Sequence, residues 1–155
     1  MFLKIIRAKS NPTGKDTAPL DVPTEQLAGE WVDIQNEGSE SISLSNLVLY
    51  HREYPTHNGN TKWGKVMDLF GTLEPGSILR IHSGGQVELS RLRPEDRDGA
   101  DLHYSTGKWY VWNNDEEDTA GLWDKDEEIW LDRVYYDASP PEGVILHRFN
   151  NKLIP

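Results

Sequence analysis

GEWVDIQN, residues 29–36, has the pattern of a β-strand with one core face. Successive side chains of a strand point to opposite faces, so Val32 and Ile34 lie on the same side. The other side carries Trp31, Asp33 and Gln35. We therefore expect Val32 and Ile34 in the hydrophobic core of a sheet protein.

Short runs of β-branched and aromatic residues recur on both sides of this stretch, separated by Gly, Pro, Asn and Asp. No segment shows sustained helical periodicity, and this combination is typical of an all-β sandwich or barrel. The expected strands cover residues 2–8, 30–35, 47–50, 66–70, 78–82, 109–112, 119–123, 129–136 and 144–149. The sequence therefore predicts an all-β fold.

Two further stretches support this interpretation. In SLSNLVLYH, residues 43–51, Leu47 and Leu49 share one face, and Leu44 closes the same core row. Residues 74–77 read EPGS, with Pro at the second position and Gly at the third, which is the chemistry of a type II turn. This turn should lead directly into the following strand.

Length and composition limit the class of protein. The 155 residues fit a single domain. The chain has 16 Lys and Arg against 26 Asp and Glu, and the resulting formal charge of -10 opposes binding to phosphate backbones and anionic membranes. Cysteine is absent, which excludes disulfides and thiolate chemistry. No run of 18 apolar residues occurs and the apolar start is short, so we expect a cytoplasmic protein without membrane insertion.

Five pieces of the sequence, taken together and in order, resemble the lamin tail domain in its prokaryotic form. They are IRAKSNPTGKD (6–16), GEWVDIQNEGSESISLSNLVLYH (29–51), LEPGSILRIHSGG (73–85), VWNNDEEDTAGLWD (111–124) and WLDRVYYD (130–137). The resemblance implies an immunoglobulin-like β-sandwich with no known catalytic activity of its own. Such domains occur in nuclear lamins, where they contact proteins, DNA and chromatin, and in prokaryotic proteins, often beside hydrolase or nuclease domains.

The resemblance divides the chain into two parts. Residues 1–137 form the expected lamin-tail-like β-sandwich domain, with an irregular link at residues 10–28. Residues 138–155 form a C-terminal extension that holds one candidate strand.

Two turns near the end of the domain carry charged residues where the family has glycine. They read DEED at residues 115–118 and KDEE at residues 125–128. A positive φ must then fall on Asn114, Asp115 or Asp126, because Asn and Asp tolerate that conformation best.

The same carboxylates supply oxygen ligands of the kind that Ca²⁺ prefers. The candidate ligands are Asp115, Glu117, Asp118, Asp124 and Asp126. However, two turns separated by a single strand lie at opposite ends of that strand, which argues against one shared ion. We favour two solvated turns that blunt the sheet edges, and we assign no metal and no other cofactor. A Ca²⁺-stabilised surface or extracellular module is the alternative.

Residue patterns typical of catalysis are missing from the sequence. The five histidines are scattered and form no H-E-x-x-H motif, and neither a G-x-S-x-G elbow nor a Gly-rich phosphate loop occurs. We therefore expect that the protein is not an enzyme.

The long connection at residues 51–65 combines basic and aromatic side chains. Connections longer than about 12 residues in a compact domain are often functional. We predict a non-catalytic module for protein–protein interaction, with contacts from Arg52, Tyr54, His57, Lys62 and Trp63. A second candidate set of contact residues is Arg91, Arg93 and Arg97. Nucleic-acid binding, which the family allows and the net charge opposes, is a second alternative.

The six tryptophans would mark a carbohydrate or protein contact surface if an aromatic row lay exposed on one sheet. Packing in the core and at the sheet edges is the favoured interpretation for each of them.

Overall fold

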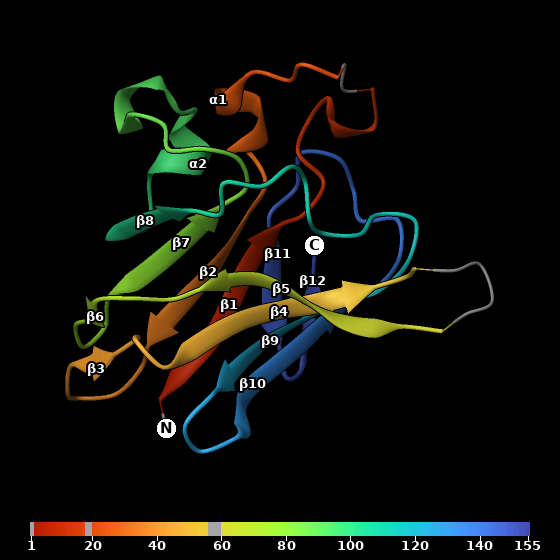
Figure 1. Ribbon diagram of the computed structural model, residues 1–155. Helices are drawn as coiled ribbons and strands as arrows, with labels where there is room; N and C mark the ends of the chain where they lie inside the picture. The colour runs from red at the N-terminus through yellow and green to blue at the C-terminus, as the bar shows by residue number, and fades with distance from the viewer. Residues whose placement is uncertain (1, 18–19, 56–59) are drawn as a thin grey trace.

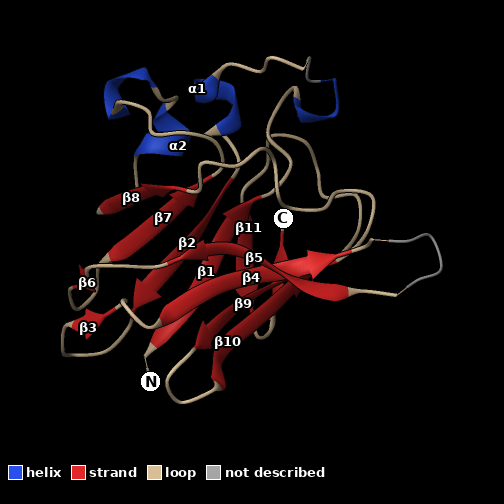
Figure 2. Ribbon diagram, in the orientation of Figure 1, coloured by secondary structure: helices blue, strands red, loops and turns tan. Residues whose placement is uncertain are grey.

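The computed structural model describes residues 2–17, 20–55 and 60–155. Its strands are β1 (Leu3–Lys9), β2 (Trp31–Asn36), β3 (Ile42–Ser43), β4 (Leu47–Glu53), β5 (Lys62–Asp68), β6 (Thr72–Leu73), β7 (Ile78–His82), β8 (Leu102–Ser105), β9 (Asp118–Asp124), β10 (Ile129–Tyr136), β11 (Leu146–Phe149) and β12 (Lys152–Ile154). The helices α1 (Thr24–Leu27) and α2 (Pro94–Arg97) are short, as are the 3-10 turns Lys15–Thr17 and Leu89–Arg91. All helical segments lie at one end of the molecule (Figure 2).

Within the described residues, ten strands form one curled sheet in the order β5-β4-β9-β10-β12-β11-β1-β2-β7-β8 (Figure 1). Neighbouring strands are antiparallel apart from the parallel pairs β10 with β12 and β7 with β8. The curl places β5, β4, β9 and β10 across the core from β1, β2, β7 and β8, while β11 and β12 join the two halves. The expected all-β, immunoglobulin-like sandwich is confirmed.

The core draws on both halves of the sheet. Val32 and Ile34 of β2 are fully buried, as the alternation in this strand predicted. They belong to the same cluster as Leu49, Leu122 and Val134 from the opposite half. Leu44 and Leu47 are also buried, so the second predicted core row is confirmed.

The second face of β2 is buried as well, which the alternation alone did not predict. Trp31 and Asp33 have no exposed surface. Arg80 donates from Nε and Nη2 to Asp33 at 2.7 and 2.8 Å, and its guanidinium carbon lies 3.7 Å from the ring centroid of Trp31. The carboxylate of Asp96 in α2 accepts from Lys9 at 2.7 Å and from the indole N–H of Trp31 at 2.9 Å. These polar side chains anchor the α2 segment to the outside of the sheet.

Residues 109–112, which were expected as a strand, are irregular. The backbone N–H of Val111 donates to Oε1 of Glu30 at 2.8 Å instead of to a neighbouring strand. Glu30 is fully buried, and burial raises the pKa of its carboxyl although the ammonium of Lys15 lies 2.5 Å away. A buried carboxylate thus takes the place of a strand partner, and this contact cannot be recognised from local sequence.

The turn at residues 74–77 has the expected form. Gly76 has a φ of 77°, and the N–H of Ser77 donates to the carbonyl of Glu74 at 3.0 Å. Both features are those of the predicted type II turn.

The prediction of a positive φ at Asn114, Asp115 or Asp126 is wrong. In the second acidic turn the residue with positive φ is Glu128, at 54°. The carboxylate of Asp124 accepts hydrogen bonds from the N–H groups of Asp126 and Glu127 at 2.9 and 3.1 Å. This side chain holds the first half of the turn, and the positive φ falls two positions after Asp126, at Glu128.

The C-terminal extension contributes two strands, where the sequence indicated one. β11 pairs with β1, and β12 pairs with both β11 and β10. The extension therefore closes the sheet between its two halves.

Candidate partner-binding surface

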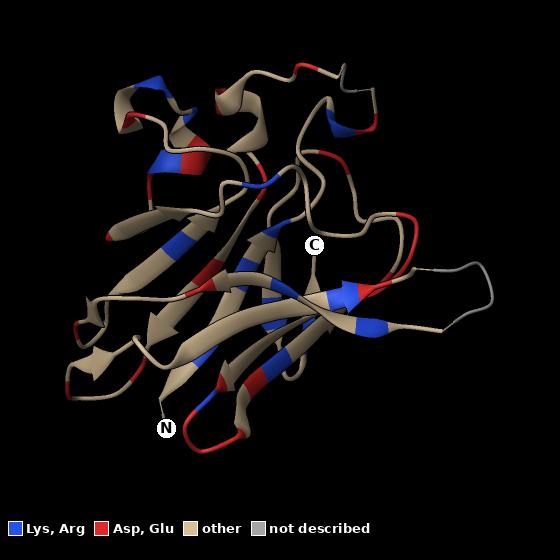
Figure 3. Ribbon diagram, viewed as in Figure 1, with Lys and Arg blue, Asp and Glu red and all other residues tan. Residues whose placement is uncertain are grey.

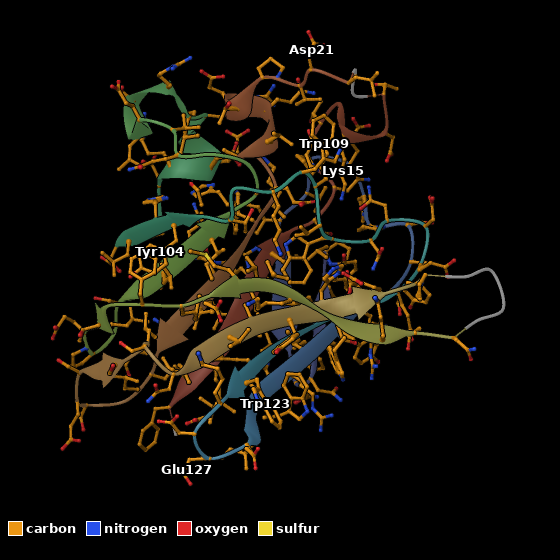
Figure 4. The ribbon with its side chains drawn as sticks, in the orientation of Figure 1. Lys15, Asp21, Tyr104, Trp109, Trp123 and Glu127 are labelled. Carbon is orange, nitrogen blue, oxygen red and sulfur yellow. The ribbon has the colours of Figure 1, made fainter. Side chains whose placement is uncertain are left out.

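Aromatic side chains gather on the outer face of the half-sheet β5-β4-β9-β10. Trp130 of β10 lies at the centre, with ring centroids 4.5 Å from Trp63 of β5, 4.9 Å from Trp123 of β9 and 5.9 Å from Tyr50 of β4. All four side chains are partly exposed. Figure 4 marks Trp123 beside β9 and β10. We call Tyr50, Trp63, Trp123 and Trp130 the aromatic patch.

The aromatic patch depends on a glycine in β9. A Cβ atom added to Gly121 would lie 2.5 Å from the ring of Trp130, which is closer than any real contact. Glycine inside a strand often marks a place where another group approaches the backbone closely. Gly121 therefore leaves the room that the central indole occupies against β9.

Two arginines stack on the patch. The guanidinium carbon of Arg52 lies 3.9 Å from the ring centroid of Trp63, and that of Arg133 lies 5.6 Å from the ring centroid of Trp130. Both arginines line a groove of about 560 Å³ that continues to Tyr135 at the end of β10. The groove thus presents aromatic rings and guanidinium groups held in place by cation–π contacts.

Asp118 positions the end of β4 from which Arg52 projects. Its carboxylate is fully buried and accepts hydrogen bonds from the backbone N–H groups of Arg52 at 2.8 Å, Asn113 at 2.9 Å and Thr119 at 2.8 Å. Nδ1 of His51 lies 3.1 Å from the same carboxylate. This side chain therefore ties the end of β4 to the loop before β9.

A family model described as Lamin Tail Domain matches residues 3–138 of the chain. The chain belongs to the lamin tail domain family. The matched residues of this lamin tail domain include the whole aromatic patch and end before β11 and β12. A comparison with curated proteins found no match.

The structure divides the predicted contact residues between two neighbouring hollows. Arg52 and Trp63 stack on each other in the groove of the aromatic patch. Tyr54 lines the adjacent pocket, where its hydroxyl donates to the backbone carbonyl of Glu117 at 2.7 Å. Lys62 is exposed and pairs with Glu53 at 3.5 Å beside the groove. His57 lies outside the described residues, and the role of the set in binding stays a prediction.

The second choice of contact residues lies elsewhere in this lamin tail domain. Arg91 pairs with Glu25, and Arg97 pairs with Asp98 at 2.9 Å. Arg93 precedes α2 at the helical end of the molecule. The fold does not bring these arginines to the aromatic patch.

Sequence reasoning missed the residues that share this surface with Arg52 and Trp63. Tyr50, Trp123, Trp130 and Arg133 come from three other strands, and only the register of the sheet brings them together. The one local signal was Gly121 inside an otherwise strand-like run. The favoured interpretation, that each tryptophan packs in the core or at an edge, overlooked this shared surface.

The acidic turns are only partly solvated. Asp115, Glu116 and Glu117 are exposed as expected, whereas Asp118 is buried and Asp124 is nearly so. Figure 3 shows the acidic residues of the two turns in separate places. Asp118 and Asp124 are the two ends of β9, and the described residues contain no group of three or more His, Asp or Glu placed to hold one metal ion. Nor do they contain a helix long and apolar enough to cross a membrane.

His82, which is buried, and His103, which is half-buried, form a hydrogen-bonded pair next to α1. Nδ1 of His82 donates to the backbone carbonyl of Ala28 at 2.7 Å, so its Nε2 accepts from Nδ1 of His103 at 2.8 Å. Burial is the largest cause that lowers the pKa of His82, to about 4, and burial followed by Arg80 lowers that of His103. Burial thus disfavours the charged form of both rings.

Acidification should destabilise this lamin tail domain through His82. The pKa of His82 is 6.5 in the unfolded chain and about 4 in the folded chain. The stability that comes from keeping this ring neutral is therefore complete above pH 6.5, and it is lost as the pH falls from 6.5 to about 4. We expect a loss of about 3 kcal/mol in the free energy of unfolding from His82. Urea unfolding at neutral pH and near pH 4 should show a smaller loss for His82→Gln than for the wild type. Equal losses in the two proteins would contradict this role of His82.

Proposed function

We propose that the chain is a non-catalytic protein-binding module that contacts its partner through the aromatic patch and its two arginines. One observation carries the proposal: Arg52, Trp63 and Trp130 form a continuous row of contacts on the open face of the sheet. Membership of the lamin tail domain family supports a binding role in general terms. The partner itself is left open.

The composition of the patch suits a protein contact. Trp, Tyr and Arg are the residues most enriched among those that dominate the affinity of protein interfaces. The ring contacts also restrict the side chains of Arg52 and Trp63 before binding, and this lowers the conformational entropy lost on association. Thr119, Tyr135 and Asn151 add polar groups along the groove.

Removing the arginines from the patch should weaken partner binding. We expect the double variant Arg52→Ala with Arg133→Ala to bind at least tenfold more weakly, which corresponds to about 1.4 kcal/mol. The partner is first identified by affinity enrichment with the wild type, and the affinity is then measured by calorimetry with the purified partner. The two side chains are partly exposed, so the fold should be retained, and thermal unfolding checks this.

Arg97→Ala is the matched control, because it removes a partly exposed arginine at the helical end of the molecule. It should leave the affinity unchanged. An unchanged affinity in the double variant would refute the proposed surface. Binding that instead requires single-stranded nucleic acid, and falls steeply with salt, would favour the nucleic-acid alternative, since stacked aromatic and arginine side chains also suit bases.

A further inference from the structure

A second hollow, next to the aromatic patch, is lined by aromatic rings and carboxylates. It has a volume of about 550 Å³. Its aromatic walls are Tyr54, Trp109, Tyr110 and Trp112. Its charged lining groups are Lys15, Asp16, Asp115 and Glu116. We call it the Trp109 pocket.

Trp109 is the most accessible ring of this pocket. Its side chain is 46% exposed, although the ring meets Tyr110 edge to face at 5.7 Å between centroids. Figure 4 shows Trp109 and Lys15 close together at one end of the molecule. A large indole exposed at the mouth of a hollow offers its face to an incoming group.

The cation already present in the pocket is neutralised. Nζ of Lys15 lies 2.5 Å from Oε2 of Glu30 and 2.5 Å from the backbone carbonyl of Trp112, and it lies 5.4 Å from the ring centroid of Tyr110. Among the described residues, Lys15 pairs with Glu30 and forms no ion pair with the carboxylates at the rim. It also shows that an ammonium group is accommodated near the ring of Tyr110.

The carboxylates at the rim make the pocket negative. Within the described part of the chain, neither Asp115 nor Glu116 forms an ion pair. The pKa of Tyr54, which also lines the pocket, reflects these negative charges. Burial is the largest cause that raises this pKa, and the carboxylates of Glu117, Asp118 and Glu116 raise it further. An opposite charge entering the pocket would therefore be attracted.

We propose that the Trp109 pocket binds the positively charged side chain of a lysine or arginine in a basic peptide segment. A cation over an indole face is attracted by the ring quadrupole, and the rim carboxylates pair with the same charge. The net charge of -10 draws a basic segment towards the molecule from a distance. This site is separate from the aromatic patch, and the proposal does not rest on the function assigned to the patch.

A synthetic lysine-rich hexapeptide with blocked ends tests the proposal, and its fully acetylated counterpart is the neutral probe. We expect the basic peptide to bind, the acetylated peptide to show no binding, and the indole N–H signal of Trp109 to shift in NMR spectra during the titration. Trp109→Ala should weaken the basic peptide about tenfold. Asp115→Asn with Glu116→Gln, which removes only exposed charges, should weaken it to a similar extent.

The matched control neutralises two exposed carboxylates at the other end of β9. Asp126→Asn with Glu127→Gln changes the net charge equally but leaves the Trp109 pocket intact. The affinity of the basic peptide should stay within about twofold of the wild type. If both double variants bound the basic peptide equally weakly, attraction to the net charge alone would explain the binding, and the site would be overturned. Tight binding of the basic peptide by Trp109→Ala would overturn it as well.

Discussion

Replacing Asp33 with alanine should lower the free energy of unfolding by about 3 to 5 kcal/mol, because it leaves a buried guanidinium without its counterion. Arg80 is only 1% exposed and donates two hydrogen bonds to Asp33. Arg7 donates to the same carboxylate at 2.9 Å. A single truncation therefore affects two cations at once, and of these Arg80 is buried whereas the side chain of Arg7 is 25% exposed.

Urea unfolding measures this loss directly. The matched control is Asp68→Ala, which breaks an ion pair with Lys65 on the surface and should leave the midpoint unchanged. A second variant, Asp33→Leu with Arg80→Met, replaces both partners of the ion pair by apolar side chains and leaves no unpaired charge at Arg80. It should therefore recover part of the unfolding free energy that Asp33→Ala loses. A midpoint for Asp33→Ala equal to that of the wild type would show that the network does not stabilise the fold.

Local pattern was sufficient for the strands that carry the core. Val32, Ile34, Leu47 and Leu49 alternate with a period of two, and each side chain is buried as that period requires. The EPGS turn was equally clear, because positive φ at its third position calls for glycine. Each of these features depends on residues that are adjacent in the sequence.

Contacts between distant segments account for the remaining differences. Residues 109–112 have the composition of a strand, yet their N–H groups meet the carboxylate of Glu30, which lies about 80 positions earlier in the chain. The second face of β2 is covered because Asp96 reaches Trp31 from α2, 65 positions away. Local periodicity contains no information about such pairs.

The candidate surface depends on register in the same way. The sequence singled out Arg52 and Trp63, which pair directly across β4 and β5. Trp130 joins them because it pairs with Trp123 on the neighbouring strand and lies over Gly121. The expectation of a connection over residues 51–65 is wrong at both ends, because β4 continues to Glu53 and β5 begins at Lys62. The basic and aromatic residues of this stretch indicated the neighbourhood of the surface, while strand pairing determines its extent.

Asp118 connects this surface to the stability of the whole domain. Replacing it with alanine should lower the free energy of unfolding by roughly 3 to 5 kcal/mol, since each buried N–H group left without a partner costs about 1 to 3 kcal/mol. The groups affected are the backbone N–H groups of Arg52, Asn113 and Thr119.

Urea unfolding together with amide hydrogen exchange tests this role of Asp118. Exchange at Arg52 and Asn113 should accelerate in Asp118→Ala under conditions where the protein stays folded. Asp118→Asn retains one side-chain acceptor oxygen and should lose about half as much stability. Glu117→Ala is the control, because its side chain is exposed one position away and should leave the midpoint unchanged. If Asp118→Ala matched Glu117→Ala, the carboxylate would be dispensable. The position of Arg52 on the aromatic patch would then have to be explained by the β4–β5 pairing alone.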